Sequence, residues 1–447
     1  MRINFRNLFA LVIISAFVWT CASEIPQKEN VENTDHQIIA DTVKNEIQIK
    51  ENVTDKKILL GIDVLAEDNF EILKNKRVGI ITNQTGVNRD LKSTIDILFE
   101  SKNVKLVALF SPEHGIRGEI EGGENIGNNI DALTKLPVYS LYGKTQKPTK
   151  KMLSDIDVLI YDIQDIGVRS YTFISTLGLA MEAASENKIE FIVLDRPNPL
   201  GGLKIEGNII EDNFKSFISQ YPIPYIYGLT CGELAKLLVN EKMIKTNSDF
   251  KLNVIAMKNW NRGMTFKDTN LKWVPTSPHI PNFETTFYYP MIGILGELRS
   301  AVSIGVGYTL PFQIVGAEWI NSFKLSFELN NQNLPGLFFR PISFKPFYGF
   351  GKGQTLNGVQ IYITNYDKVN LTAVQFFIIS SLQKLYPEKD LFKLSDQNEI
   401  KMFNNAIGTD KISKMIKNRK DIKEILDFLN KDEEKFRKIS AKYYLYN

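Results

Sequence analysis

Five short, almost uninterrupted apolar runs, separated by segments with helical periodicity, constrain the fold of this chain most strongly. The runs are RVGIITNQ (77–84), VKLVALFS (104–111), PVYSLYG (137–143), VLIYDIQD (158–165) and IEFIVLDRP (189–197). A strand that is apolar along its whole length is buried on both faces, as in a parallel sheet covered by helices. We therefore predict an α/β fold with a Rossmann-like parallel-sheet domain.

The same pattern suggests where the domains begin and end. A further unit, YPIPYIYG (221–228), GELAKLLVNEK (232–242) and FKLNVIAMKN (250–259), extends the Rossmann-like catalytic domain over residues 57–262. Residues 263–447 indicate a second, mixed α/β domain at the C-terminus, with strands in LPFQIVG, LFFRPISFKPF and GVQIYITNY and helices in INSFKLSFELNN and LTAVQFFIISSLQKLYP. We expect the active-site cleft between the two domains, where ligands often bind.

The N-terminus is typical of an exported protein. Arg2 and Arg6 precede LFALVIISAFVW, an apolar run of signal-peptide length that is too short to span a membrane. The run ends in VWTCAS, a loose lipobox, which predicts a lipoprotein signal peptide over residues 1–21 and lipidation of Cys21. A plain secretory signal is the alternative. Residues 22–56 are polar and predict a flexible tether. We therefore expect a protein lipid-anchored to a bacterial membrane, in the periplasm or at the cell surface.

Composition and missing motifs exclude several classes of function. The net charge is only +3 and no basic stripe occurs, so nucleic-acid binding is not expected. Two cysteines form no disulfide framework, and three histidines argue against a His-rich metal centre. The turn TNQTGVNRD (82–90) lacks the glycines of a dinucleotide fingerprint, and the chain has no P-loop, HExxH or GxSxG. We predict no cofactor and no metal; calcium in the acidic, glycine-rich loop described below is a weaker alternative.

Polar residues follow every predicted strand of the first domain. In a parallel sheet, ligands bind outside the carboxyl ends of the strands. We therefore predict that the residues at these ends bind substrate: Asn83, Gln84, His114, Tyr142, Gln164, Asp165, Arg169, Asp195, Arg196 and Asn198. The alternative is that Asp165 and Asp195 pair with Arg169 and Arg196 and merely fix the loops.

The stretch FSPEHGIRGEIEGGENIG (110–127) favours carboxylate chemistry. Glycoside hydrolysis needs one carboxylic acid to protonate the leaving oxygen, and a second carboxylate or the sugar's own acetamido group to complete the reaction. Glu113 follows a strand end and is our candidate for the acid. Glu119 and Glu124 are candidate catalytic partners, with Glu121 and Asp165 as further possibilities. A spacing of about 5 Å between the two carboxyl groups would give retention and about 6.5–9.5 Å inversion, which the sequence leaves open.

Several long motifs occur together and in order. They are NKRVGIITNQTGVNRD (75–90), SPEHGIRG (111–118), DIQDIGVRSYTFIST (162–176), LDRPNPLGG (194–202) and WVPTSPHIPNFETTFYYP (273–290). On these motifs the chain resembles the exo-β-N-acetylmuramidases of glycoside hydrolase family 171, from about residue 58 to the end. The resemblance implies two α/β domains with the site between them. It also implies release of N-acetylmuramic acid from the non-reducing end of peptidoglycan fragments.

The resemblance also implies roles for particular residues. The family's acidic residue corresponds to Glu113, and its motif neighbours to His114 and Arg117. An arginine suits the lactyl carboxylate of muramic acid, and Arg117, Arg169 and Arg196 are the candidates. His279 is a further candidate for substrate binding. The chain departs from the family's usual pattern at Val306, Tyr227 and His279, which leaves the exact sugar specificity open.

Together these features favour a lipid-anchored glycosidase of cell-wall recycling that acts on peptidoglycan fragments of the MurNAc–GlcNAc type. The alternative is a non-catalytic lipoprotein that binds cell-wall sugars in the same cleft. The oligomeric state is left open.

Overall fold

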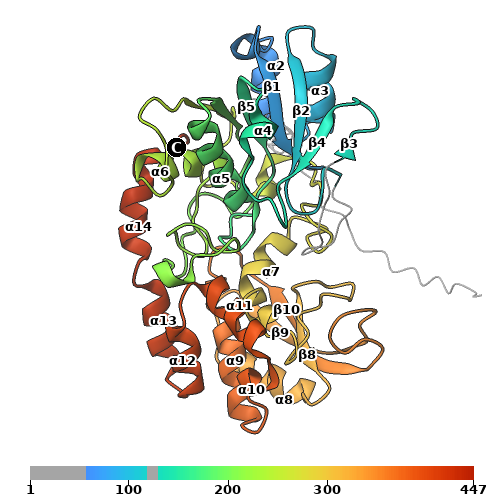
Figure 1. Ribbon diagram of the computed structural model, residues 1–447. Coiled ribbons are helices and arrows are strands. Elements are labelled where there is room, and N and C mark those ends of the chain that lie inside the picture. Colours follow the sequence, from blue (N-terminus) through green and yellow to red (C-terminus); the bar gives the residue numbers. More distant parts are fainter. Residues whose placement is uncertain (1–56, 118–128) are drawn as a thin grey trace, which may run out of the picture. The chain divides into compact units, whose positions relative to one another are not determined.

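The larger of two sheets has seven strands in the order β3-β4-β2-β1-β5-β6-β7 (Figure 1). The structure is a computed structural model that describes residues 57–117 and 129–447. The strands are β1 (Arg77–Thr82), β2 (Lys105–Ser111), β3 (Asn129–Ile130), β4 (Pro137–Ser140), β5 (Val158–Asp162), β6 (Glu190–Leu194) and β7 (Leu252–Ile255). All neighbouring strands are parallel except β3, which runs antiparallel to β4. The predicted α/β fold is confirmed.

Successive residues of the central strands pack on opposite faces of this sheet. In β5, Val158 and Ile160 join one buried cluster, whereas Leu159 and Tyr161 join the other. Helices α2 (Gly61–Glu67) and α3 (Thr94–Glu100) contribute to the first cluster, and α5 (Phe173–Glu186) and α6 (Cys231–Asn240) to the second. Because both faces are covered, the central strands are apolar throughout, which is the pattern that the sequence shows.

The smaller sheet is antiparallel, in the order β8-β10-β9. Its strands β8 (Ile314–Ala317), β9 (Leu337–Phe344) and β10 (Leu356–Ile363) overlap the three predicted runs. Helices α8 (Ser322–Asn330) and α9 (Val374–Leu385) were also predicted, and α8 packs against β9 and β10. The remaining helices are α4 (Lys150–Leu153), α7 (Thr285–Ile292), α10 (Leu391–Leu394), α11 (Gln397–Ile407), α12 (Lys411–Lys417), α13 (Ile422–Asn430) and α14 (Glu433–Ser440).

The apolar segment YPIPYIYG (221–228) adds no strand to the larger sheet. Residues 221–228 make only isolated bridges, in which Ile226 pairs with Val168 and Glu206. Pro222 and Pro224 lack the N–H group that a strand inside a sheet must donate, so this buried segment cannot join the ladder. It instead runs along the core, with Tyr225 and Tyr227 fully buried.

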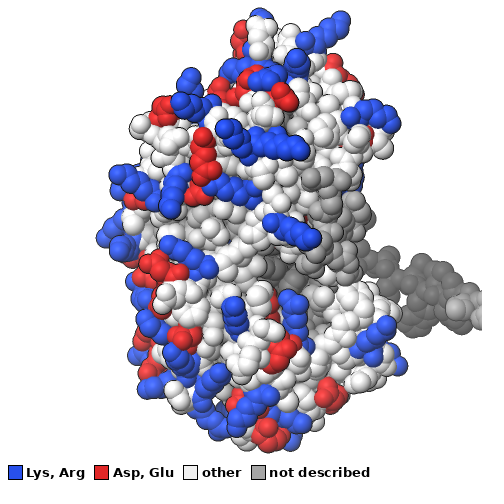
Figure 2. Space-filling view, in the orientation of Figure 1, with Lys and Arg blue, Asp and Glu red and all other residues white. Residues whose placement is uncertain are grey.

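One apolar cluster extends from the parallel sheet into the C-terminal helices. It includes Ile81 of β1, Phe173 of α5, Phe339 of β9 and Phe436 of α14. Both sheets thus share a continuous core, and the boundary near residue 262 stays a prediction. No helix within residues 57–117 and 129–447 is both long and apolar enough to cross a membrane. Basic and acidic side chains alternate over the face drawn in Figure 2 without forming a basic stripe.

Candidate active site

The carboxyl ends of β1, β2 and β5 meet at one edge of the larger sheet. The strand order reverses between β1 and β5, since the chain runs outward to β2 on one side and to β6 on the other. Such a switch point is where open α/β sheets bind ligands. Gln84 follows β1, Glu113 follows β2 and Gln164 follows β5. A narrow cavity at this point is lined by Thr85, Gln164 and Trp273, among others.

Glu113 lies on a tight turn directly after β2. The amide of Gly115 donates to the carbonyl of Pro112 at 3.3 Å and closes the turn. His114 adopts a φ of +72°, which is uncommon for a residue other than glycine. Thr172, at the start of α5, donates its hydroxyl to Oε2 of Glu113 at 2.5 Å. The turn and this hydrogen bond together fix the direction of the carboxylate.

The side chain of His114 anchors the turn to the protein core. Its side chain is buried, and its ring meets that of Phe173 edge-on with centroids 6.4 Å apart. Aromatic pairs of this geometry stabilise packing by about 1 kcal/mol beyond the buried area. His114 thus combines an unfavourable backbone conformation with a well-packed side chain. Such strain is common where the surrounding structure holds a functional group in place.

Tyr171 connects this edge to the chain segment before α7. Its hydroxyl donates to Oγ1 of Thr276 at 2.8 Å, and Gln84 donates its amide to the carbonyl of Pro275 at 2.7 Å. Burial raises the pKa of Tyr171 well above its usual range, and the negative charges of Asp165 and Glu113 add to the effect. Tyr171 therefore lies within electrostatic reach of both carboxylates.

Asp165 is almost completely buried beneath this edge, with 5% of its surface exposed. Its Oδ2 accepts hydrogen bonds from the Tyr227 hydroxyl and, at 2.7 Å, from the Gly167 amide. Burial raises the pKa of Asp165 to about 7, although these hydrogen bonds oppose the shift. Asp165 is thus held within the protein, and Tyr227, one of the departures from the family pattern, is one of its partners.

The raised pKa of Asp165 predicts a pH-dependent stability. Folded Asp165 keeps its proton up to about pH 7, whereas an unfolded aspartic acid loses it near pH 4. The folded state therefore binds this proton more tightly, and Asp165 lowers the free energy of unfolding as the pH rises from about 4 to 7. Asp165→Asn removes this contribution. The free energy of unfolding of the wild type minus that of the variant should therefore fall as the pH rises from about 4 to 7. Denaturant titrations measure the difference, and a pH-independent difference would contradict the assignment.

The two arginines predicted to bind substrate at strand ends are structural instead. Arg169 is fully buried and donates to the carbonyls of Asn208, Ile223, Ala406 and Ile407 at 2.7–3.1 Å. Arg196 pairs with Asp162, with Nε to Oδ1 at 2.6 Å. The alternative pairing with Asp165 and Asp195 is also wrong, because neither arginine uses those carboxylates as its ion-pair partner.

Asp195 and Asn198 are likewise occupied within the protein. Asp195 accepts hydrogen bonds from Thr230, the Gly232 amide and Tyr446 at 2.6–2.8 Å. Burial raises the pKa of Asp195 to about 6. Asn198 donates to the Leu229 carbonyl and accepts from the Leu200 amide, each at 3.0 Å. Both residues fix loops beside the site, and we remove them from the candidate substrate contacts.

Four other predicted residues are partly exposed or have a buried polar atom without a hydrogen-bond partner among the residues that the structure describes: Arg117, Tyr142, Asn83 and Gln84. Arg117 is 42% exposed in its side chain and pairs with Asp131 at 3.0 Å. Tyr142 is partly buried, with its ring 5.9 Å from that of Phe217. The amide nitrogen of Asn83 and the amide oxygen of Gln84 are buried without a hydrogen-bond partner in the described part of the chain.

The remaining predicted residues are His279, Gln164, the three glutamates of the acidic loop and Cys21. His279 shares a hydrogen bond of 2.7 Å with the hydroxyl of Tyr348, which belongs to the loop after β9. Gln164 donates its amide to the carbonyls of Asp165 and Pro197. Glu119, Glu121 and Glu124, and also Cys21, lie outside the described residues. Among residues 57–117 and 129–447, no three His, Cys, Asp or Glu side chains gather as metal ligands would.

Tyr171, Thr172 and Thr276 lie at the candidate site but are not among the catalytic and substrate-binding residues that the sequence predicts. Tyr171 and Thr172 stand just before α5, beyond the polar strand end that drew attention to Gln164 and Asp165. Their position before a helix on the same sheet edge is the signal that could have found them. Thr276 is more than a hundred positions from Tyr171, and nothing in its local sequence indicates the contact.

Fold and site define an α/β protein with a doubly wound sheet and a carboxylate-bearing turn at its switch point. Within that class, residues 78–284 match the N-terminal part and residues 287–446 the C-terminal part of the family described as exo-beta-N-acetylmuramidase NamZ. The chain belongs to this family, which confirms the resemblance drawn from its motifs.

Individual relatives agree with this assignment. The chain is 45% identical over 390 residues to the peptidoglycan beta-N-acetylmuramidase NamZ of Bacillus subtilis (strain 168). The aligned residues cover 87% of this chain and 92% of that protein. Crystal structures of two DUF1343 family proteins from Bacteroides fragilis NCTC 9343 are similar in fold. One is 52% identical with a TM-score of 0.84, the other 29% identical with a TM-score of 0.69. Each alignment covers 88% of this chain and 99% of the other.

Proposed function

We propose that the protein is a glycosidase that releases N-acetylmuramic acid from the non-reducing end of peptidoglycan-derived sugars. The observation that carries the proposal is Glu113, held by Thr172 on a tight turn at the carboxyl end of β2. Support comes from the family and from the Bacillus subtilis relative, whose name states a peptidoglycan β-N-acetylmuramidase.

In this proposal Glu113 is the general acid. It protonates the oxygen of the leaving sugar as the bond to the anomeric carbon breaks. The Thr172 hydroxyl holds one carboxylate oxygen, so the position of the proton is set before substrate binds. The second group is a carboxylate of the acidic loop, Glu119, Glu121 or Glu124, or the acetamido group of the sugar itself. Asp165 is too deeply buried to reach a sugar directly.

Arg117 is the arginine that we assign to the lactyl carboxylate of muramic acid. Arg169 and Arg196 are buried and hold partners within the protein. Arg117 follows Glu113 by four residues and is partly exposed, and its guanidinium group has five N–H donors. The pair with Asp131 leaves donors for a second carboxylate, in the bidentate geometry that arginine favours.

Hydrolysis of a defined substrate tests this proposal. The purified protein should release the chromophore from a chromogenic β-N-acetylmuramide and should split MurNAc–GlcNAc into its two sugars. The corresponding β-N-acetylglucosaminide lacks the lactyl group and serves as the matched control, which should react much more slowly. Binding of MurNAc–GlcNAc without turnover would contradict the enzymatic proposal and favour a sugar-binding lipoprotein.

We further propose that Cys21 carries a lipid anchor. The support is the apolar run that ends at VWTCAS, followed by the polar segment 22–56. Mass analysis of the membrane-bound protein should find Cys21 as the first residue, with the added mass of acyl chains. Cys21→Ser should leave the protein unprocessed or release it from the membrane. An unmodified Cys21, or cleavage at another residue, would contradict the proposal.

A further inference from the structure

A groove beside the smaller sheet is built from two loops that hold each other in place. One loop joins β9 to β10 and the other precedes β8. Between the loops, the amide of Phe347 donates to the carbonyl of Gly307 at 2.7 Å. Within the β9–β10 loop, the amide of Gly353 donates to the carbonyl of Pro346 at 2.9 Å. Gly307 has a φ of +89°, and a Cβ there would lie 2.0 Å from the carbonyl oxygen of Tyr348. The close approach of the two loops therefore requires glycine at this position.

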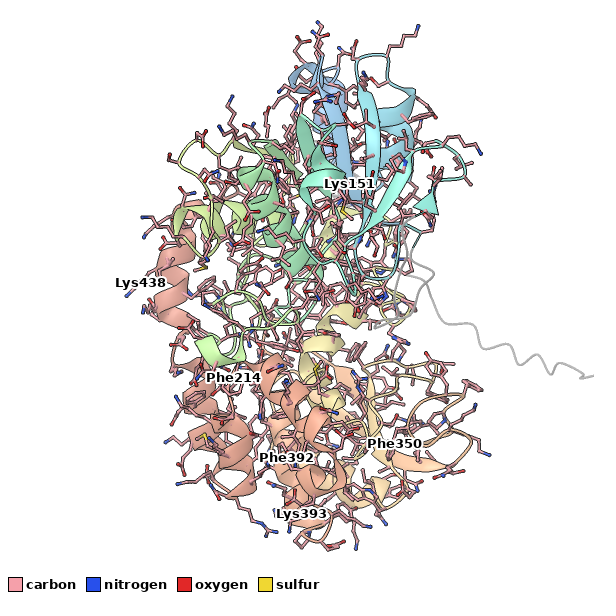
Figure 3. The ribbon with its side chains drawn as sticks, in the orientation of Figure 1. Lys151, Phe214, Phe350, Phe392, Lys393 and Lys438 are labelled. Carbon is pink, nitrogen blue, oxygen red and sulfur yellow. The ribbon has the colours of Figure 1, made fainter. Side chains whose placement is uncertain are left out.

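The groove has a volume of about 680 Å³ and combines aromatic rings with positive charge. Phe347 is 68% exposed, and its ring stacks on that of Tyr308, with centroids 6.3 Å apart and an angle of 21° between the planes. Lys345 and Lys352 line the same groove, and no acidic side chain does so among the described residues. Phe350 belongs to the same loop and is labelled beside the smaller sheet in Figure 3.

These properties fit an anionic sugar. The C–H face of a pyranose ring is apolar, so its packing on an exposed aromatic ring is favourable. Two lysines beside that ring attract a carboxylate, and among the described residues no acidic side chain lines the groove with them. A neutral sugar would use only the ring, and a free anion only the lysines.

Three hydrogen bonds, joined by short stretches of chain, connect the loop of the groove to the candidate active site. Tyr348 follows Phe347 in the chain and shares a hydrogen bond with His279. His279 lies three residues after Thr276, which binds Tyr171. Tyr171 is the chain neighbour of Thr172, which holds Glu113. The segment 276–279 therefore joins the loop of the groove to the residues around Glu113.

We infer that this groove binds a further stretch of the same peptidoglycan strand whose non-reducing end occupies the Glu113 site. A sugar ring stacks on Phe347, and the lactyl carboxylate of a downstream muramic acid lies between Lys345 and Lys352. The inference rests on the proposed function, which it extends from a disaccharide to longer strands as the preferred substrate.

Kinetics with substrates of two lengths test the inference. Phe347→Ala should lower kcat/KM for peptide-free glycan strands of several disaccharide repeats roughly three- to tenfold, as expected for the loss of one aromatic contact. It should leave turnover of the chromogenic β-N-acetylmuramide unchanged. Phe323→Ala is the matched control, since Phe323 on α8 is 76% exposed and lies outside the groove. Equal kcat/KM for long strands in Phe347→Ala and Phe323→Ala would overturn the inference.

A binding measurement separates failure of the groove from failure of the proposed function. Calorimetry with Glu113→Gln and the same strands reports binding even if the protein hydrolyses nothing. The double variant Lys345→Gln/Lys352→Gln, made in that background, should bind more weakly and with less dependence on salt. Chitin oligosaccharides, which lack the carboxylate, should bind equally to both proteins. If the lysine substitutions leave strand binding unchanged, the groove does not hold this ligand.

Discussion

Glu113→Gln is expected to lower kcat for MurNAc–GlcNAc, whose sugar leaving group needs a proton, by about a hundredfold or more. Glutamine has the same shape and can still accept the hydrogen bond from Thr172 that fixes the wild-type side chain. It carries no acidic proton, so the leaving oxygen must depart without protonation. Because binding groups are unchanged, KM should change little. Steady-state kinetics of both proteins measure the two effects separately.

Two controls make the loss in Glu113→Gln specific. Glu434→Gln alters a carboxylate on α14 that is 73% exposed and pairs with Lys438, so its kcat should match that of wild type. Thermal unfolding should show that Glu113→Gln is as stable as wild type to within a few degrees. Equal turnover by Glu113→Gln and wild type would remove Glu113 from the role of acid.

The sheet and the position of the site were predictable because they depend on short-range pattern. Apolar runs predicted β1, β2, β5 and β6, and the rule for strand ends then selected Gln84 and Glu113. That rule needs only the direction of the strands, which the intervening helices determine. The motif around Glu113 and the fold therefore led to the same residue independently.

The roles of the charged residues were less predictable, because the partner of a long side chain is set by tertiary contacts. Arg169 binds the carbonyl of Ile407, which lies 238 positions later in the chain. Asp195 accepts a hydrogen bond from Tyr446, 251 positions away. Nothing near either residue in the sequence indicates these partners. An arginine at a strand end is thus compatible both with substrate binding and with bracing distant segments.

Arg169→Met is expected to lower the free energy of unfolding by about 3–5 kcal/mol, among the largest effects of a single substitution. The guanidinium group joins the carbonyls of Asn208 and Ile223 to those of Ala406 and Ile407 at the end of α11. Burial lowers the pKa of Arg169 to about 9, so the group is still charged at neutral pH. Methionine fills a similar volume but removes the Arg169 donor from the carbonyls of Asn208 and Ile223, and leaves those of Ala406 and Ile407 only their bonds from Ser219 and Asn208. Denaturant unfolding measures the loss.

The structural role of Arg169 also predicts how two further variants behave. Arg169→Lys keeps the charge, but one ammonium group cannot reach carbonyls on both sides as a planar guanidinium group does, so its stability should lie between wild type and Arg169→Met. Arg340→Met removes an exposed arginine of β9 whose side chain donates to Gln360 at 3.2 Å, and should change stability by about 0.5 kcal/mol or less. If Arg169→Met does not fold, Arg169→Lys still gives a measurable loss. If Arg169→Lys were as stable as wild type, the positive charge alone would be sufficient. The planar geometry of the guanidinium group would then not be needed.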